Sequence, residues 1–241
     1  MRETLAYEAN VDSPDSNDIY DLYLVDIGYN EVQLIIFMKI LFTFVDGTDS
    51  AGNAVKWTAD ETKKFVATWQ GQVATAWTAK RYAKYKDIYI SIHVAFDIRV
   101  GTSFARSHWQ ILVEKLPAGS SGKTSFVWRD QIGKKYDVQL DSLDDQKKTG
   151  VGDGTQTGSI HEFGHMLGLG DEYTADAAKA LRDDKKSIMN SGSSVRPRHY
   201  ASLLQWAGKK LAKVYKKIEE NRKKPVLWDK NTYGTSATYM G

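Results

Sequence analysis

The sequence contains no cysteine, no long apolar run and no large net charge. Without cysteine the chain forms no disulfide, so its stability does not depend on the redox state of its compartment. The same absence excludes a cysteine nucleophile and every zinc site built from thiolates.

Two further absences concern membranes and export. Residues 1–8 lack the charged and apolar blocks of a signal peptide. The longest apolar run, residues 34–45, includes Lys39 and is too short to span a bilayer. We therefore expect a soluble protein. If it acts outside its producing cell, it is a mature fragment or is exported without an N-terminal signal.

The net charge of +3 is small but unevenly placed. Residues 209–224 carry a cluster of basic side chains with only Glu219 and Glu220 as acids; the basic members are Lys209, Lys210, Lys213, Lys216, Lys217, Arg222, Lys223 and Lys224. This cluster fits a polyanion-binding face. It fits better the solvated side of a helix, because an apolar stripe runs at helical spacing through Leu203, Ala207, Leu211, Val214 and Ile218.

The chain has the means to bury a core, since 41% of its residues are hydrophobic and seven are tryptophan. No internal repeat and no clear linker divides the sequence. We expect a single domain over residues 1–241, with a polar, turn-rich arm at residues 1–18 and a tail at residues 225–241.

Hydrophobic periodicity predicts an α+β fold. Strands are expected at residues 20–45 (one or two), 88–100, 109–116, 125–129 and 136–140. Helices are expected from residue 58 to about 82, at 158–169, at 175–184 and at 197–222. The first helix has a capping box in Thr58 and Glu61. The aspartates of residues 141–159 match no calcium-loop spacing, so this segment is expected to be a solvated loop rimming the site.

The stretch that carries chemistry is His161-Glu162-Phe163-Gly164-His165, an H-E-x-x-H sequence. On a helix, residues four apart share one face, so both imidazoles can reach one Zn²⁺ ion. Glu162 lies about 100° around the helix from His161, where it can hold a water without being a ligand. A surface helix with two histidines and a neutralising glutamate is the alternative, and the longer motif disfavours it.

The motif continues as H-x-x-G-x-x-D. Gly168 can end the helix, because glycine accepts a left-handed backbone, and the turn then brings Asp171 beneath the metal as a third ligand. Three protein ligands leave a position for water, as in catalytic zinc sites. Glu172 and His199 remain alternatives for the third ligand.

Eighteen residues after Asp171 comes Met189, within a small, turn-forming segment, residues 187–192. Residues 157–200 together resemble the metzincin zinc peptidases, whose pattern is H-E-x-x-H-x-x-G-x-x-(H/D) followed by a Met-turn. The aspartate, with Tyr173 two residues on, looks closest to the snapalysin-type metzincins. Histidine is the commoner third ligand in this family, and Asp171 departs from that pattern.

The resemblance implies a metzincin-like (zincin) fold: a twisted mixed sheet, an active-site helix at its floor, the Met-turn and a C-terminal helix. It implies that residues 136–140 form a sheet edge to which a peptide substrate adds as a strand. It makes Met189 a packed floor beneath the metal, although an ordinary core methionine is also compatible. His199 and Tyr200 are candidates for contacting the metal or the developing oxyanion, against ordinary structural roles.

The sequence thus favours a monomeric zinc endopeptidase with Glu162 as general base, acting on a protein or peptide. The missing cysteines and signal, with one compact domain, favour a bacterial effector or toxin that is secreted or injected and has an inhibitor or delivery partner. The alternatives are a zinc amidase acting on peptidoglycan peptides, a non-catalytic metal-binding module, and a polyanion-binding module that uses the helix at residues 209–224.

Overall fold

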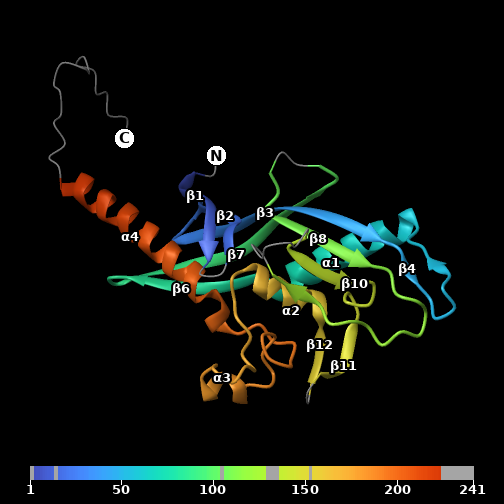
Figure 1. The fold of residues 1–241 in the computed structure, drawn as a ribbon. Helices are drawn as coiled ribbons and strands as arrows, with labels where there is room; N and C mark the ends of the chain where they lie inside the picture. The colour runs from blue at the N-terminus through green and yellow to red at the C-terminus, as the bar shows by residue number, and fades with distance from the viewer. Residues whose placement is uncertain (1–2, 14–15, 104–105, 129–135, 152–153, 224–241) are drawn as a thin grey trace, which may run out of the picture.

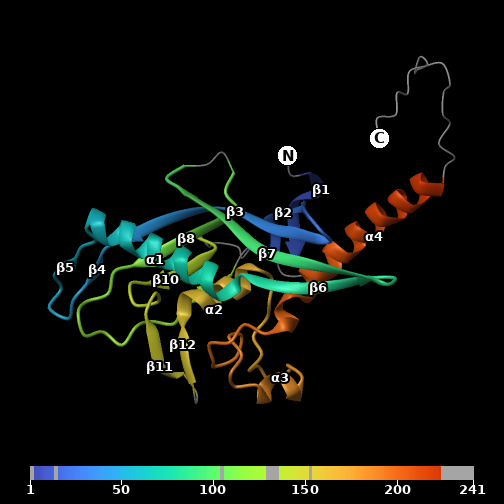
Figure 2. The same ribbon diagram turned by 180° about the vertical axis from the view of Figure 1, so that it is seen from behind.

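The structure is a computed structural model, and it describes residues 3–13, 16–103, 106–128, 136–151 and 154–223. These residues form a mixed α+β fold in which an eight-stranded mixed sheet carries two helices, α1 (Ala59–Trp77) and α2 (Gly158–Met166), on one face (Figures 1 and 2). One hydrophobic cluster extends from the sheet through both helices, with the buried rings of Trp69, Trp77 and Phe163 between them. The expected α+β class is therefore confirmed.

The sheet is organised around the long strand β3 (Glu31–Val45). Its first part pairs in parallel with β7 (Ile88–Gly101), and its last residues pair in parallel with β8 (Trp109–Glu114). On the same side as β8, and opposite β7, the first part of β3 pairs antiparallel with β2 (Ser16–Gly28). Strands β2 and β3 are joined by a tight turn in which Gly28, Tyr29 and Asn30 have positive φ angles. The prediction of strands within residues 20–45 and 88–100 is confirmed.

The amino-terminal segment is not an arm, as its polar composition had suggested. Residues Thr4–Ser13 form β1, which pairs antiparallel with β2 at the edge of the sheet. The strand is held because Leu5, Ala6 and Val11 pack on the core, and because Glu8 accepts hydrogen bonds from Trp206 and Lys210 of the C-terminal helix. These partners are almost two hundred residues away, and for that reason local composition did not reveal the strand.

Helix α1 begins at the predicted capping box. The Thr58 hydroxyl accepts from the Glu61 amide, and the Glu61 carboxylate accepts from the Thr58 amide. The helix ends at Trp77 and not near residue 82, because residues Ala79–Tyr85 form strand β6, which pairs antiparallel with β7. The residues of β6 alternate between exposed and half-buried positions, as a strand requires, with Lys80, Tyr82 and Lys84 on the exposed side.

The expected edge strand lies inside the sheet. Residues Val138–Asp141 form β10, which pairs with β8 in parallel, and a further short strand, β9 (Phe126–Val127), pairs antiparallel with β10 and is the edge. The prediction of residues 136–140 as the edge is therefore wrong. A strand of two residues has no periodicity from which its pairing could have been recognised.

Residues 141–159 are more ordered than the solvated loop that was expected. Two short strands, β11 (Lys147–Val151) and β12 (Gly154–Thr157), form an antiparallel hairpin that leads directly into α2. Asp144 is fully buried and accepts hydrogen bonds from Ser125 and Lys148. The carboxylate is stabilised by these partners in place of water.

The carboxyl-terminal third contains α3 (Lys179–Asp183), a 3-10 turn at Pro197–Tyr200 and the long helix α4 (Ala201–Lys223). The apolar stripe predicted for α4 is buried at Leu203, Ala207 and Leu211. Lys209, Lys213 and Lys216 are exposed, as expected for the solvated side. The predicted tail, residues 225–241, lies outside the described residues. Among those that are described, no helix has the length and apolar character needed to cross a membrane.

Two pairs of short strands complete the fold. The segment after β3 forms a small hairpin of β4 (Gly47–Thr48) and β5 (Ala54–Val55) just before α1. The β11–β12 hairpin, α3 and the turns after α2 lie below α2 on the side away from the sheet (Figure 1). This side is where the candidate site is found.

Candidate metal centre

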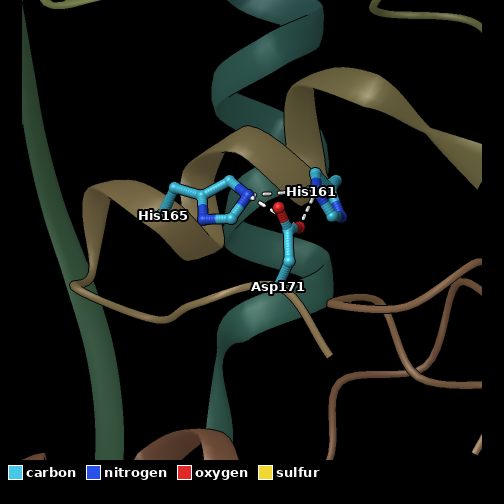
Figure 3. Close-up of side chains that lie close together, drawn as sticks. All are labelled: His161, His165 and Asp171. Atoms are coloured by element: carbon cyan, nitrogen blue, oxygen red, sulfur yellow. Dashed lines mark hydrogen bonds and ion pairs between the residues drawn. The ribbon is translucent and has the colours of Figure 1, made fainter. Parts of the chain in front are cut away.

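Helix α2 positions the two histidines of the H-E-x-x-H sequence. It follows β12 without an intervening loop and buries Phe163 and Met166 against the core. This burial fixes the rotation of the helix about its axis, so His161 and His165, one turn apart, face away from the sheet. Figure 3 shows both rings directed toward the segment that follows the helix.

The end of α2 brings the third residue back. Gly168 has a φ angle of +83°, its amide donates to the His165 carbonyl, and the Leu169 amide donates to the Gly164 carbonyl. These two bonds form a Schellman motif, which reverses the chain at the end of a helix. Asp171 is thereby returned beneath the histidines, as the sequence predicted for a glycine at this position.

The three side chains meet at nearly equal separations. The Oδ1 atom of Asp171 lies 3.2 Å from the Nε2 atom of His161 and 3.2 Å from that of His165. The two Nε2 atoms are 3.1 Å apart. This is the one cluster of at least three potential metal-ligating side chains found in the described part of the chain. Of the predicted ligands, the structure brings together His161, His165 and Asp171.

Both histidines are held in the tautomer that a metal requires. The Nδ1 of His161 is 2.7 Å from the carbonyl oxygen of Ile188, and the Nδ1 of His165 is 2.7 Å from that of Leu169. A carbonyl oxygen can only accept, so each Nδ1 donates to it, and a ring without a second proton presents its Nε2 lone pair to the cluster. Carbonyl partners of this kind are typical of histidines that bind metals.

With both rings neutral, the cluster consists of three acceptor atoms that face one another. Asp171 Oδ1 is buried, and the two histidine Nε2 atoms are the polar atoms that face it. For a tetrahedral zinc ion with bonds of about 2.0–2.1 Å, neighbouring ligand atoms are roughly 3.3 Å apart. The observed separations of 3.1–3.2 Å are close to this value. The donor set and its spacing thus fit a divalent cation such as Zn²⁺.

The electrostatics favour positive charge at this point. Burial alone would raise the pKa of Asp171, but the two histidines hold the pKa well below its ordinary value. Burial alone would lower the pKa of His165, but hydrogen bonding to Asp171 and the charges of Glu162 and Asp171 raise it. The negative charge of Asp171 and a positive charge on His165 stabilise each other. A bound cation would be stabilised by the same negative charge.

Met189 forms the floor under α2. It is fully buried, and a Cβ atom placed on Gly164 would lie 2.2 Å from the Met189 sulfur. Only a residue without a side chain allows the thioether to come this close to the helix between the two histidines. Met189 therefore lies where the resemblance placed it, as a packed support.

The backbone of the Met-turn holds the ligand-bearing segments on both sides. The Ile188 carbonyl accepts from His161, and the Met189 carbonyl accepts from the Glu172 amide at 2.8 Å, next to Asp171. The turn itself is closed by the Asn190 and Gly192 amides, which both donate to the Ser187 carbonyl. The Ile188 carbonyl thus holds His161, and the next carbonyl, that of Met189, holds the segment that carries Asp171.

Glu162 lies beside the cluster in a cavity of about 630 Å³, which His161 also lines. The glutamate is only 7% exposed. Burial raises its pKa above the ordinary value, His161 and His165 lower it, and Asp144 and Asp171 raise it further. A carboxylate with a raised pKa takes up and releases protons near neutral pH more readily than an exposed one does.

Two residues at the site were missed by sequence reasoning. Tyr173 lines the same cavity, its ring is stacked 6.5 Å from that of His161, and burial together with Asp171 raises the pKa of its phenol to about 12. Gln156 of β12 is buried and donates to the Ile188 and Asn190 carbonyls at 2.8 and 3.0 Å. The spacing of Tyr173 from Asp171 was a usable signal; nothing local marked Gln156.

The remaining candidates do not reach the cluster. Glu172 is buried and receives a bidentate pair of hydrogen bonds from Arg198, both at 2.7 Å. His199 is buried between Glu172 and Ser187, and the Tyr200 hydroxyl donates to the Trp77 carbonyl at 2.7 Å. These groups are satisfied within the protein, so as alternative ligands or oxyanion donors the predictions for Glu172, His199 and Tyr200 are wrong.

Comparison with protein-family models, curated proteins and solved structures gives no match to this chain. Function is therefore argued from the site itself.

Proposed function

We propose that this protein is a zinc-dependent endopeptidase with His161, His165 and Asp171 as metal ligands. The observation that carries the proposal is the convergence of three potential ligand atoms, 3.1–3.2 Å apart, beside a buried glutamate in an open cavity. A metal site that served only to stabilise the fold would need neither the cavity nor the glutamate.

When bound, a zinc ion polarises a carbonyl group and lowers the pKa of water to near neutrality. Glu162 then acts as the general base, because its carboxylate lines the cavity next to His161 and is not consumed by an ion pair with a lysine or arginine among the described residues. The same carboxyl group delivers the proton to the leaving amine. Burial raises the pKa of Glu162, which favours a group that must both take up and release a proton.

Tyr173 is placed to stabilise charge on the substrate carbonyl oxygen. Its phenol lines the cavity and keeps its proton at neutral pH, because its pKa is raised to about 12. A protonated phenol can donate a hydrogen bond to a developing oxyanion. This role is proposed in place of the one considered for Tyr200 and His199, whose bonds lie away from the cavity. The Tyr173 phenol itself hydrogen-bonds Asp171 and would exchange that bond for one to the oxyanion.

The arrangement of elements supports the metzincin-like resemblance. The mixed sheet, α2 on its face, the Met-turn and α4 follow in the expected order. The sheet edge is formed by β9, whose residues Phe126 and Val127 directly follow Ser125, a residue that lines the cavity. An extended peptide that adds to this edge would run past the metal ligands.

The test is cleavage of a reduced, unfolded protein such as casein by zinc-loaded enzyme. The proposal predicts new internal termini by mass spectrometry, loss of cleavage with 1,10-phenanthroline, and recovery when zinc is restored. Cleavage restricted to peptidoglycan stem peptides would favour the amidase in place of the endopeptidase. Absence of zinc-dependent cleavage of both substrates would contradict the proposal.

A further inference from the structure

The cavity beside the metal ligands is lined by cationic, acidic and polar side chains with one aromatic ring, that of Tyr173, and no aliphatic residue is among its lining residues. Three lysines contribute to the lining, namely Lys123, Lys148 and Lys185. Peptide-binding cavities that select apolar side chains are lined mostly by apolar residues. The lining of this cavity therefore suits a charged or polar substrate side chain.

Two of the three lysines are already neutralised. The Nζ of Lys123 is 2.6 Å from a carboxylate oxygen of Glu114, and the Nζ of Lys148 is 2.7 Å from Asp144. Asp144 in turn receives hydrogen bonds from Ser125 at 2.5 Å and from the Asp141 amide at 2.7 Å. The negative charge of Asp144 is therefore balanced by Lys148 and by these donors within the cavity wall. Asp144 attracts or repels a ligand only weakly.

Lys185 is different, because no carboxylate forms an ion pair with it in the part of the chain that the structure describes. The two acids that precede it are engaged elsewhere: Asp183 binds Lys179 at 2.5 Å, and Asp184 binds Arg196 at 2.6 Å. The side chain is exposed, so its ammonium group is solvated and available.

The position of Lys185 is fixed by the Met-turn region, although its side chain is free. Its carbonyl accepts a hydrogen bond from the Ser191 hydroxyl, and the neighbouring Lys186 carbonyl accepts from the Ser194 amide at 2.9 Å. The same region holds His161 through Ile188. Lys185 is thus attached to the rigid segment that supports the metal ligands, on the cavity wall formed with Asn190 and Ser191.

We propose that this cavity binds an acidic side chain of the substrate next to the scissile bond, with Lys185 as its ion-pair partner. The inference rests on the proposed endopeptidase function and adds the substrate class. An ion pair at a solvated rim is weak, so the preference is expected to be about two- to fivefold and not absolute.

The experiment uses internally quenched peptides built around a bond that the enzyme cleaves in casein. Each of the two residues flanking that bond is in turn Glu, Gln or Lys. At one of the two positions, kcat/KM is expected to fall in the order Glu, Gln, Lys. In Lys185→Glu the order should reverse, and Lys185→Met should remove the preference.

Lys186→Glu is the matched control, because Lys186 is exposed and adjacent but does not line the cavity. It makes the same change in net charge and should keep the wild-type order. A second readout without turnover is binding of the Glu and Lys peptides to Glu162→Gln, measured by fluorescence anisotropy. The Glu peptide should bind more tightly, and adding Lys185→Glu should reverse this difference.

The outcomes separate the inference from the function on which it rests. Cleavage with no charge preference, or a preference that Lys185→Glu leaves unchanged, would overturn the inference and leave the endopeptidase proposal intact. If no peptide is cleaved but the Glu peptide binds in a Lys185-dependent way, the endopeptidase proposal fails and the acidic-ligand site stands. If the peptides are neither cleaved nor bound, both fail.

Discussion

The Nδ1 atom of His161 lies 2.7 Å from the carbonyl oxygen of Ile188, the residue before Met189. This hydrogen bond connects the helix that carries two ligands to the turn that supports them. It fixes the ring tautomer, orients the Nε2 lone pair toward Asp171, and accounts for the position of a turn that itself supplies no ligand. The chemistry of the cluster therefore depends on residues outside the H-E-x-x-H sequence.

Glu162→Gln tests the general base. The amide is isosteric and remains polar, so the fold and the zinc content should be unchanged. It cannot accept the proton from water, and we expect kcat to fall by about 10²- to 10⁴-fold. Casein cleavage and zinc content are measured on the same preparation. Wild-type turnover by a zinc-loaded variant would remove Glu162 from the mechanism.

Gly164→Ala tests the close packing of Met189 against α2. The added methyl group would meet the Met189 sulfur at 2.2 Å, and we expect destabilisation of about 1–3 kcal/mol in urea unfolding. Gly71→Ala is the matched control. Gly71 lies within α1 with nothing near its Cβ position, so alanine there should stabilise by about 1 kcal/mol. Equal effects of the two substitutions would contradict the packing argument.

Gln156→Leu tests whether the Gln156 side chain holds the turn at residues 187–192 in place. The two hydrogen bonds to the Ile188 and Asn190 carbonyls are lost, so the turn should hold His161 less firmly. We expect zinc affinity, measured by competition with a chelator, to fall by about 10- to 100-fold.

The control for this variant is Gln70→Leu, which removes a comparable bond to the Ile98 carbonyl away from the cluster. Its zinc affinity should match that of the wild type. A Gln156→Leu protein with unchanged zinc affinity would show that the turn keeps its position without the Gln156 hydrogen bonds.

Asp184→Asn tests a pH dependence of stability. Hydrogen bonds from Arg196, and then from Arg198, hold the pKa of Asp184 at about 2, although burial opposes them. A depressed carboxyl pKa contributes stability above the unfolded-state value of about 3.9, and this contribution is lost as the pH falls through about 2. The free energy of unfolding of the variant should therefore be lower at pH 6, by about 1 kcal/mol after allowance for solvent screening.

The difference between wild type and Asp184→Asn should shrink as the pH is lowered from 4 to 2. Asp183→Asn is the neighbouring control, because its pair with Lys179 is exposed and screened by solvent. A difference between wild type and Asp184→Asn that stays constant over this range would mean that the Asp184 pairs do not stabilise the fold.

Local patterns predicted the parts of the molecule that local interactions determine. The His161–His165 spacing, the chain reversal at Gly168 and the capping box of Thr58 and Glu61 each depend on contacts within a few residues. The strands within residues 20–45 and 88–100 were predicted because the hydrophobic pattern of a strand repeats over many residues, and the burial in the structure follows it.

Partners far away in the sequence determined what could not be predicted. Strand β1 is stabilised by Trp206, β10 is covered by a strand of two residues, and Tyr200 is committed to Trp77. Gln156 gave no signal, because the two carbonyls that accept its hydrogen bonds are more than thirty residues away, although its amide nitrogen also lies 3.1 Å from His161 Nδ1. Every residue has a backbone carbonyl, so residue types do not reveal a contact of this kind. Only the structure identifies it.

The most direct test of the account is the zinc content of the purified protein after dialysis, measured by mass spectrometry on wild type, His161→Ala and His165→Ala. The account predicts one zinc ion per wild-type chain and far less than one in each variant, with the folded state of each checked by circular dichroism. A folded wild-type protein without stoichiometric zinc, or histidine variants that retain it fully, would contradict the assignment of His161, His165 and Asp171 as a metal centre.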